Sequence, residues 1–194
     1  MARPREFDVD SALESAMQTF WVKGYEATSV DDLCESTGLG RSSLYAAFGD
    51  KRQLYLRALD RYEDTAATRL ATALNGPRPI RESIAAFLDR IIGDIVSGPG
   101  RRGCFIGNCA AELARGDREA ANQVRRSLAR VEMAFCEALT RARARGEIDA
   151  KSDVTALSRH FTAGIQGLRL VGKANPDREV LGDIARVMLR ALEL

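Results

Sequence analysis

The sequence predicts an all-α protein of about nine helices, with a three-helix N-terminal domain joined by one long helix to a C-terminal helical bundle. Three observations predict this architecture. Apolar residues recur at steps of three and four along most of the chain, the period of a helix with one buried side. Almost no segment alternates apolar and polar residues as strands do. The segment 75–79 (Asn-Gly-Pro-Arg-Pro) breaks the helical pattern between the two regions.

The first helix is expected from Asp8 to Lys23. Gly24 follows a basic last turn, and this combination is typical of a helix end. One side of the helix would be buried through a stripe formed by Val9, Leu13, Ala16, Met17 and Phe20.

Two short helices separated by a turn are predicted within residues 29–48. The hydroxyl of Ser29 can cap the first helix, and the two aspartates that follow favour its positive end. That helix should end near Gly38, and Gly40 can cap the next one, which runs through Phe48. The buried side of the first of these two helices is expected to consist of Val30, Leu33 and Cys34.

A fourth, long helix should begin after Asp50 and run to Leu74. Because it bridges the two regions, the predicted domains are residues 1–50 and residues 51–194. Its apolar stripe is Leu54, Ala58, Tyr62, Ala66 and Leu70.

The second half is predicted to be a helical bundle. Gly164 and Gly167 in its penultimate helix would allow another helix to approach closely. Apolar residues left over on the last two helices would pair two subunits. Helices are expected near 80–96, 107–115, 117–145, 152–173 and 177–193.

Composition places the chain among ordinary globular proteins. Of its 194 residues 45% are hydrophobic and 29% charged, outside the range of disordered chains. The first residues lack the apolar run of a signal peptide, and no later segment approaches about 18 consecutive apolar residues, so we expect a cytoplasmic protein without a membrane partner. The four cysteines should then be thiols.

The net charge of +2 does not by itself indicate a nucleic-acid partner. Residues 1–60 are even acidic, with seven basic and ten acidic side chains. Between Leu39 and Ala58, however, only Asp50 opposes four cations, and local charge is what meets phosphates. These cations are Arg41, Lys51, Arg52 and Arg57.

The segment 41–48 (Arg-Ser-Ser-Leu-Tyr-Ala-Ala-Phe) has two different sides on a helical wheel. Leu44, Ala47 and Phe48 form the inner side. The outer side presents groups that suit base edges and phosphates: a guanidinium, hydroxyls, a methyl and a phenol. Residues 29–48 are therefore interpreted as a helix-turn-helix. The alternative is a surface helix whose polar side merely faces water. The outer residues are Arg41, Ser42, Tyr45 and Ala46, with Ser43 at the border.

The order of these features resembles the TetR/AcrR family of bacterial transcriptional repressors. The resemblance is specific over residues 6–66 and general in the remaining helices. It is carried by Phe20, Gly24-Tyr25, Thr28-Ser29-Val30, Gly38, Arg41-Ser42-Ser43-Leu44-Tyr45, Phe48 and Lys51.

The resemblance implies a repressor that binds a palindromic double-stranded DNA operator as a homodimer through its last two helices. A small-molecule or thiol-reactive effector would release it. Arg41, Ser42, Ser43 and Ala46 would face bases, whereas Thr28, Ser29, Tyr45, Ala47 and Lys51 would lie towards the DNA backbone. Arg3 and Arg5 would add contacts from an N-terminal arm.

A dinucleotide site offers a rival interpretation, because Gly98, Gly100 and Gly103 match G-x-G-x-x-G. That motif requires a preceding strand, but residues 80–96 have the pattern of an amphipathic helix. We therefore expect a loop between helices here and predict no cofactor.

The sequence offers two further candidates for chemistry. Cys104 is either a small buried residue or, beside Arg101 and Arg102, a redox-sensing thiol with a lowered pKa. The single histidine, His160, is interpreted as a packing or interface residue. Neither a metal site nor catalytic residues are predicted, because no histidine or cysteine spacing supports them. The protein is therefore not expected to be an enzyme.

A small apolar or aromatic effector is expected in the bundle, where few buried charges are evident. The candidate lining residues are Phe87, Ile91, Phe105, Cys109, Met133, Phe135, Phe161 and Ile165.

Overall fold

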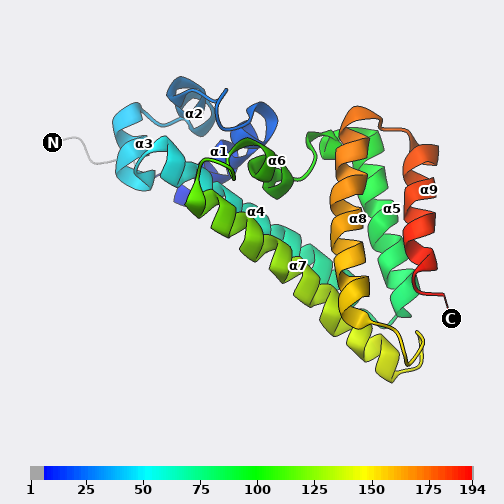
Figure 1. The fold of residues 1–194 in the computed structure, drawn as a ribbon. Coiled ribbons are helices and arrows are strands. Elements are labelled where there is room, and N and C mark those ends of the chain that lie inside the picture. The colour runs from blue at the N-terminus through cyan, green and yellow to red at the C-terminus, as the bar shows by residue number, and fades with distance from the viewer. Residues whose placement is uncertain (1–6, 194) are drawn as a thin grey trace.

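The computed structural model describes residues 7–193, and within this range the chain forms nine α-helices and one short 3-10 helix without any strand. The predicted all-α architecture is confirmed (Figure 1). The predicted arm residues Arg3 and Arg5 lie outside the described range. The elements are α1 (Val9–Lys23), α2 (Val30–Thr37), α3 (Arg41–Phe48), α4 (Lys51–Leu74), α5 (Ile80–Ser97), η1 (Pro99–Arg102), α6 (Phe105–Glu112), α7 (Arg118–Ala144), α8 (Val154–Ala174) and α9 (Arg178–Arg190).

The first four helices begin and end at the residues that the sequence indicates. Gly24 ends α1 with φ 83°, a conformation that costs glycine little. Ser29 caps α2 through a capping box, in which its hydroxyl accepts from the Asp32 amide and the Asp32 carboxylate accepts from the Ser29 amide. The Asp50 carboxylate accepts from the Gln53 amide at 2.7 Å and caps α4.

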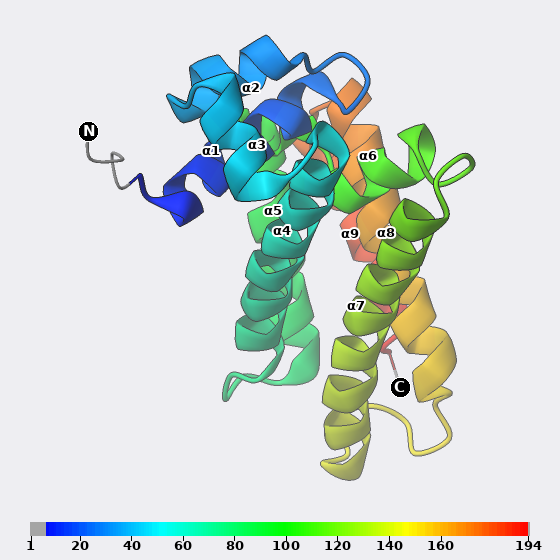
Figure 2. The ribbon, with the colours of Figure 1, turned by 90° about the vertical axis from the view of Figure 1, so that its left-hand side faces the viewer.

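The long helices α4 and α7 pack together and connect the two ends of the molecule (Figures 1 and 2). Helices α1 to α3 surround the first turns of α4, and α5, α8 and α9 gather at the other end (Figure 1). We call α1–α3 with the first half of α4 the N-terminal unit, and the helices α5, α7, α8 and α9 the bundle.

Two apolar cores hold these parts together, and the first of them extends beyond the N-terminal unit. It contains Phe105 of α6, whose ring meets Tyr55 at 5.3 Å and Tyr62 at 5.8 Å between centroids. The second core fills the bundle around Phe135 and Phe161. Helix α6 therefore couples the N-terminal unit to the remainder, and the division at residue 50 stays a prediction.

The connections between the later helices differ in detail from the sequence expectation. The glycine-rich segment contains η1, and α6 begins at Phe105, two residues before its expected start. Gly100 allows η1 to lie against the end of α5, since a Cβ there would come within 2.7 Å of the Ile95 backbone. Gly164 lets α8 approach Met188 of α9 as predicted, whereas Gly167 faces open space within this chain. Along residues 7–193, we find no helix with both the length and the apolarity that a membrane crossing requires.

Candidate DNA-binding surface and effector pocket

Helix α3 carries a buried side and an exposed polar side, as the helical wheel predicts. Leu44 and Phe48 are 2% and 3% exposed and belong to the first core. Arg57 on α4 supports the C-terminal end of α3, because its guanidinium lies 5.0 Å from the Phe48 ring and donates to the Ala47 carbonyl. The predicted base-facing and backbone-facing residues on the outer side are all exposed: Arg41, Ser42, Ser43, Tyr45 and Ala46.

Arg41 is held in place by a carboxylate from the preceding helix. Its Nη2 donates to Asp31 Oδ1 at 2.7 Å, and this hydrogen bond raises the pKa of the guanidinium. Both side chains are largely exposed, so the pair gains little in water and can exchange Asp31 for another acceptor. The Asp31 carboxylate thus orients the guanidinium, which can still bind another acceptor.

The flanking residues divide into exposed and buried groups. Ser29 is exposed, and Lys51 lies with its Nζ 4.5 Å from the centre of the Tyr25 ring. Thr28, by contrast, is 1% exposed, and its hydroxyl donates to the Gly24 carbonyl at 2.5 Å. The prediction that the Thr28 side chain contacts the DNA backbone is therefore wrong, because the hydroxyl secures the turn between α1 and α2.

Arg52 does not belong to the surplus of positive charge that the sequence suggests. Its guanidinium binds the Asp117 carboxylate through two hydrogen bonds of 2.6 and 2.8 Å, and also Glu119 at 2.8 Å. These bonds hold the pKa of Asp117 well below its usual range. Because Arg57 supports α3, Arg41 and Lys51 remain as the candidates for DNA contact among the four cations between Leu39 and Ala58.

Helix α6 also contacts the segment that follows α1. The Glu112 carboxylate accepts from the amides of Tyr25 and Glu26 at 3.0 and 2.8 Å. The contact resembles a helix cap supplied from a distant segment, and it ties the connection between α1 and α2 to the region that precedes α7.

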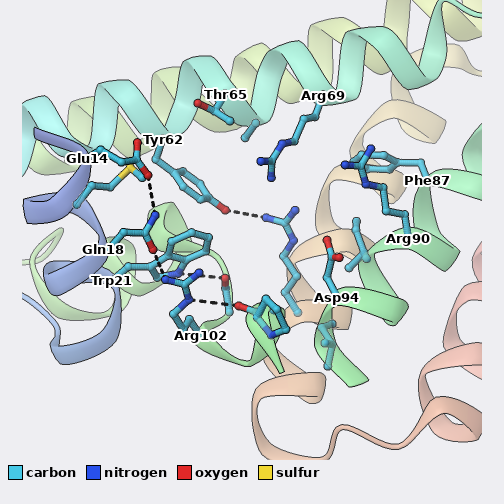
Figure 3. Close-up of a pocket in the computed structure, with 18 residues that line it drawn as sticks. Glu14, Gln18, Trp21, Tyr62, Thr65, Arg69, Phe87, Arg90, Asp94 and Arg102 are labelled. Atoms are coloured by element: carbon cyan, nitrogen blue, oxygen red, sulfur yellow. Dashed lines mark hydrogen bonds between the residues drawn. The ribbon is translucent and has the colours of Figure 1, made fainter. Parts of the chain in front are cut away.

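A pocket of about 510 Å³ lies where the N-terminal unit meets the bundle (Figure 3). Its walls come from α1, α4, α5, η1 and α8. Trp21 of α1 forms part of one wall; its Nε1 donates to the Gly103 carbonyl at 3.3 Å, and its ring lies edge-on to Tyr62. The volume falls within the range of small-molecule sites.

Two of the eight predicted ligand residues, Phe87 and Ile91, line this pocket. Met133 is 58% exposed and lies outside it. The other five are fully packed in the two cores, so the prediction that they contact a ligand is wrong for this pocket. Apolar periodicity identifies core residues and pocket residues alike, which explains the error. The five are Phe105, Cys109, Phe135, Phe161 and Ile165.

The sequence interpretation missed the polar residues of the pocket. Arg169 occupies α8 one residue after the buried Leu168, and its Nη1 donates to the Tyr62 hydroxyl at 2.9 Å. A charged residue beside an apolar stripe was the available signal. The pocket is nevertheless lined by four arginines that the sequence interpretation did not include: Arg69, Arg90, Arg102 and Arg169.

Cys104 is buried immediately before α6 and faces different partners from those expected. The Tyr62 hydroxyl donates to its Sγ at 3.7 Å, while Arg102 instead lies over the Trp21 ring at 4.2 Å. Burial raises the pKa of the nearby Cys109 thiol, which therefore stays protonated.

His160 makes a packing contact, with its Nε2 3.3 Å from the Met188 carbonyl oxygen and its ring edge-on to Phe161. No group of three or more histidine, cysteine, aspartate or glutamate residues is placed to hold a metal ion in the part of the chain that the structure describes.

Comparisons with known proteins identify both regions. Residues 12–58 match the family described as "Bacterial regulatory proteins, tetR family", and residues 81–188 match "Tetracyclin repressor-like, C-terminal domain". The transcriptional repressor ComR of Escherichia coli (strain K12) is 35% identical over 97% of this chain and 90% of its own length. YezE, an uncharacterized transcriptional regulator of Bacillus subtilis (strain 168), is 31% identical over the full length of both chains.

A solved structure extends the similarity to a DNA complex. It contains a cysteine mutant of the TetR family regulator CifR, complexed with 26-bp double-strand operator DNA. That protein is 30% identical to this chain, with a TM-score of 0.87 over 98% of this chain and 100% of that one. These relatives are regulators rather than enzymes, and regulators of this family are dimers that bind double-stranded DNA. The chain belongs to the TetR family of bacterial transcriptional regulators.

Proposed function

We propose that this protein is a cytoplasmic repressor that binds a palindromic operator as a homodimer and leaves it when an effector enters the pocket. The observation that carries the proposal is the position of the pocket between α1 of the N-terminal unit and α5 and α8 of the bundle. A ligand there contacts the part that reads DNA and the part that holds the subunits together.

Helix α3 is proposed to enter the major groove. Arg41, Ser42, Ser43 and Ala46 would face bases, because they are exposed and follow one another around the free side of the helix. Ser29, Tyr45 and Lys51 would contact phosphates from its edges. Ala47 is half-buried against the core and contributes at most a backbone-facing contact.

The homodimer is proposed to form through α8 and α9. Three large apolar side chains on these helices, Leu170, Val180 and Val187, are 71%, 38% and 58% exposed in the single chain. Exposed apolar side chains gathered on neighbouring helices are typical of a surface that a partner covers. A palindromic operator requires that the twofold axis of this dimer separate the two α3 helices by about one turn of DNA or a multiple of it.

The effector would act by preferring one arrangement of α1 relative to the bundle. Glu112 and the Arg52–Asp117 pair link the N-terminal unit to α6 and α7, so a shift of α1 is transmitted to the spacing of the two α3 helices. The affinity lost at the operator then equals the difference in ligand affinity between the two arrangements.

A second proposal concerns a thiol-reactive effector acting at Cys104. It is supported by the contact of its Sγ with the Tyr62 hydroxyl beside the pocket. Modification would add bulk where α4, α6 and α8 meet. Native labelling with an iodoacetamide reagent followed by peptide mapping tests it: fast labelling accompanied by operator release is expected, and labelling of Cys104 only after unfolding rejects it.

The repressor function is tested by selecting genomic fragments that the purified full-length protein retains and footprinting them. We expect a short inverted repeat, protected by two protomers, upstream of a coding region. A footprint without dyad symmetry, or retention of all fragments alike at physiological salt, contradicts the proposal.

A further inference from the structure

We propose that the pocket takes an organic carboxylate, with Arg169 binding its oxyanion and the ring of Trp21 or of Phe87 packing against its apolar or aromatic body. The inference rests on the proposed function, since it specifies the chemical class of effector for the same pocket. It refines the small apolar or aromatic effector that the sequence suggests by adding a carboxylate.

The first reason is the charge of the lining. Four arginines face two carboxylates in this pocket. One of the two, Glu14, is already neutralised, because Arg61 from outside the pocket donates to it at 2.7 Å. Burial alone would raise the pKa of Glu14, but the hydrogen bonds from Arg61 and Gln18 lower it, so it stays an ion paired with Arg61. Asp94 is thus the single carboxylate left to oppose four guanidinium groups.

The second reason is the set of partners around Arg169. The Arg169 side chain is partly buried, its guanidinium donates to a phenol hydroxyl, and within residues 7–193 it makes no ion pair. Arg169 remains a cation in spite of this burial, because a guanidinium is not deprotonated in proteins. A cation removed from water with only neutral partners is costly, and a guanidinium has five donors, enough for a bidentate carboxylate in addition to Tyr62.

Tyr62 fixes how Arg169 presents its remaining donors. Its hydroxyl accepts from Arg169 and donates to Cys104 Sγ, and its ring is packed against Trp21 and Phe105. In Figure 3 the hydrogen bond that the Tyr62 hydroxyl accepts from Arg169 lies in the middle of the space bounded by the labelled residues. The anion-binding group is therefore oriented before a ligand arrives, which lowers the entropy cost of binding.

The third reason is that the pocket offers ring surfaces as well as positive charge. Arg69 and Arg90 are exposed, and Figure 3 shows Arg69 reaching from α4 into the space. They attract anions from solution. Trp21, covered on one side by Arg102, and the half-buried Phe87 offer surfaces for a ring or alkyl chain. A bare inorganic anion would leave these surfaces unused.

The test uses the full-length protein and pairs of ligands that differ in charge. Trp21 is the only tryptophan of the chain and lines the pocket, so its emission reports occupancy directly. Octanoate and 4-phenylbutyrate are titrated beside octanamide and 4-phenylbutyramide, with inorganic phosphate as the bare oxyanion. Calorimetry repeats the measurement independently of fluorescence.

We expect at least one carboxylate to bind with a Kd below about 1 mM and about tenfold or more tighter than its amide. Arg169→Met should remove this preference, so that a carboxylate and its amide bind with similar Kd values. Arg159→Met is the matched control, because Arg159 lies on the same helix, is exposed, and pairs with Glu132 outside the pocket. Should Arg169→Met misfold by circular dichroism, the carboxylate-to-amide ratio of the unmodified protein still decides.

Amides that bind as tightly as carboxylates, phosphate that binds as well as they do, or a preference that survives Arg169→Met would overturn the inference, as would the absence of any response to either carboxylate. The operator assay separates this from the proposed function. Carboxylates that bind through Arg169 without releasing DNA contradict the proposed release mechanism alone. Neutral ligands that release DNA as well as carboxylates contradict the carboxylate inference alone.

Discussion

Arg41 can exchange a carboxylate for a base without disturbing the fold. Its partner Asp31 is exposed and no core residue depends on the pair, so the cost of separating them is small. A guanine edge offers two acceptors to the same guanidinium. Arg41 is therefore expected to carry sequence preference, while Asp31 keeps the side chain extended along the DNA-facing side until binding.

The first prediction follows from this exchange. Arg41→Ala should weaken binding to the selected operator by about ten- to hundredfold and change binding to a scrambled duplex by much less. Fluorescence anisotropy titrations on both duplexes at one salt concentration measure the two losses. Equal losses on both duplexes would show that Arg41 contacts phosphate rather than a base.

Lys51 should behave differently, because an ammonium beside the DNA backbone recognises charge and not sequence. Lys51→Ala is expected to weaken binding to both duplexes by a similar factor. It should also reduce the magnitude of the slope of log affinity against log salt concentration by about one unit. Titrations from low to physiological salt give the slope. Its contact with the Tyr25 ring is lost as well, so a thermal melt accompanies the variant to show that the fold is retained.

At the scale of single helices, the capping box of α2 is a purely local device. Ser29→Ala removes the hydroxyl that accepts from the Asp32 amide and should reduce the free energy of unfolding by about 1 kcal/mol. Urea denaturation measures this loss. Ser29→Asp should restore the cap and hence the stability, but it places a negative charge at the proposed phosphate contact and should still weaken DNA binding. If Ser29→Asp recovered both stability and DNA binding, Ser29 would not be a phosphate contact.

The pairing of Arg52 with Asp117 joins the beginning of α4 to the beginning of α7 and gives stability a pH dependence. The folded-state pKa of Asp117 is depressed below the unfolded value of about 3.9, so the pair stabilises the protein above that pH and its contribution is lost as the pH falls below it. Asp117→Asn should lower Tm by a few degrees at pH 7, since asparagine keeps the helix cap but loses the charge.

The difference in Tm between the two proteins should shrink as the pH falls from about 5 to about 2, which scanning calorimetry measures. Asp177→Asn is the control: Asp177 caps α9 with the same pattern of amide contacts and makes no ion pair within residues 7–193. A comparable Tm loss in that variant would assign the effect to capping instead of to Arg52.

Local chemistry explains why the helices were predictable and the pocket was not. Caps such as Ser29 and Asp50, and stops such as Gly24, act within four residues of themselves, so the adjacent sequence is enough to predict where these helices begin and end. The exposed side of α3 follows from helical period in the same way. The pocket joins segments more than 100 residues apart, as in the contact of Tyr62 with Arg169, and no local pattern reports such a meeting.

The same limit applies to side chains whose role depends on a distant partner. Arg52 and Arg57 count as positive charge in the sequence, yet one binds Asp117 and the other supports α3. Thr28 is a polar residue of the kind found in surface turns, yet it is buried, and its hydroxyl donates to the Gly24 carbonyl. Burial and partner choice are tertiary properties, and they decide which of several suitable residues actually face a ligand.

For the whole molecule, dimerisation through α8 and α9 should control operator binding. Val187 and Leu170 are exposed in the single chain and do not fill its cores, so a charge at either position costs the monomer little stability. Val187→Asp combined with Leu170→Asp would place two carboxylates on each side of the proposed twofold interface, where like charges and lost apolar burial both oppose association.

The double variant is expected to sediment as a monomer, to melt cooperatively, and to bind the palindromic operator at least about a hundredfold more weakly, because two linked α3 helices bind with an effective concentration that a single one lacks. Its affinity for an isolated half-site should remain that of one protomer of the unmodified protein. Met133→Asp, on the exposed part of α7, is the matched control and should leave both the dimer and operator binding intact. A double variant that remains dimeric would show that the interface lies elsewhere, because an apolar contact could not tolerate two buried carboxylates facing their symmetry copies.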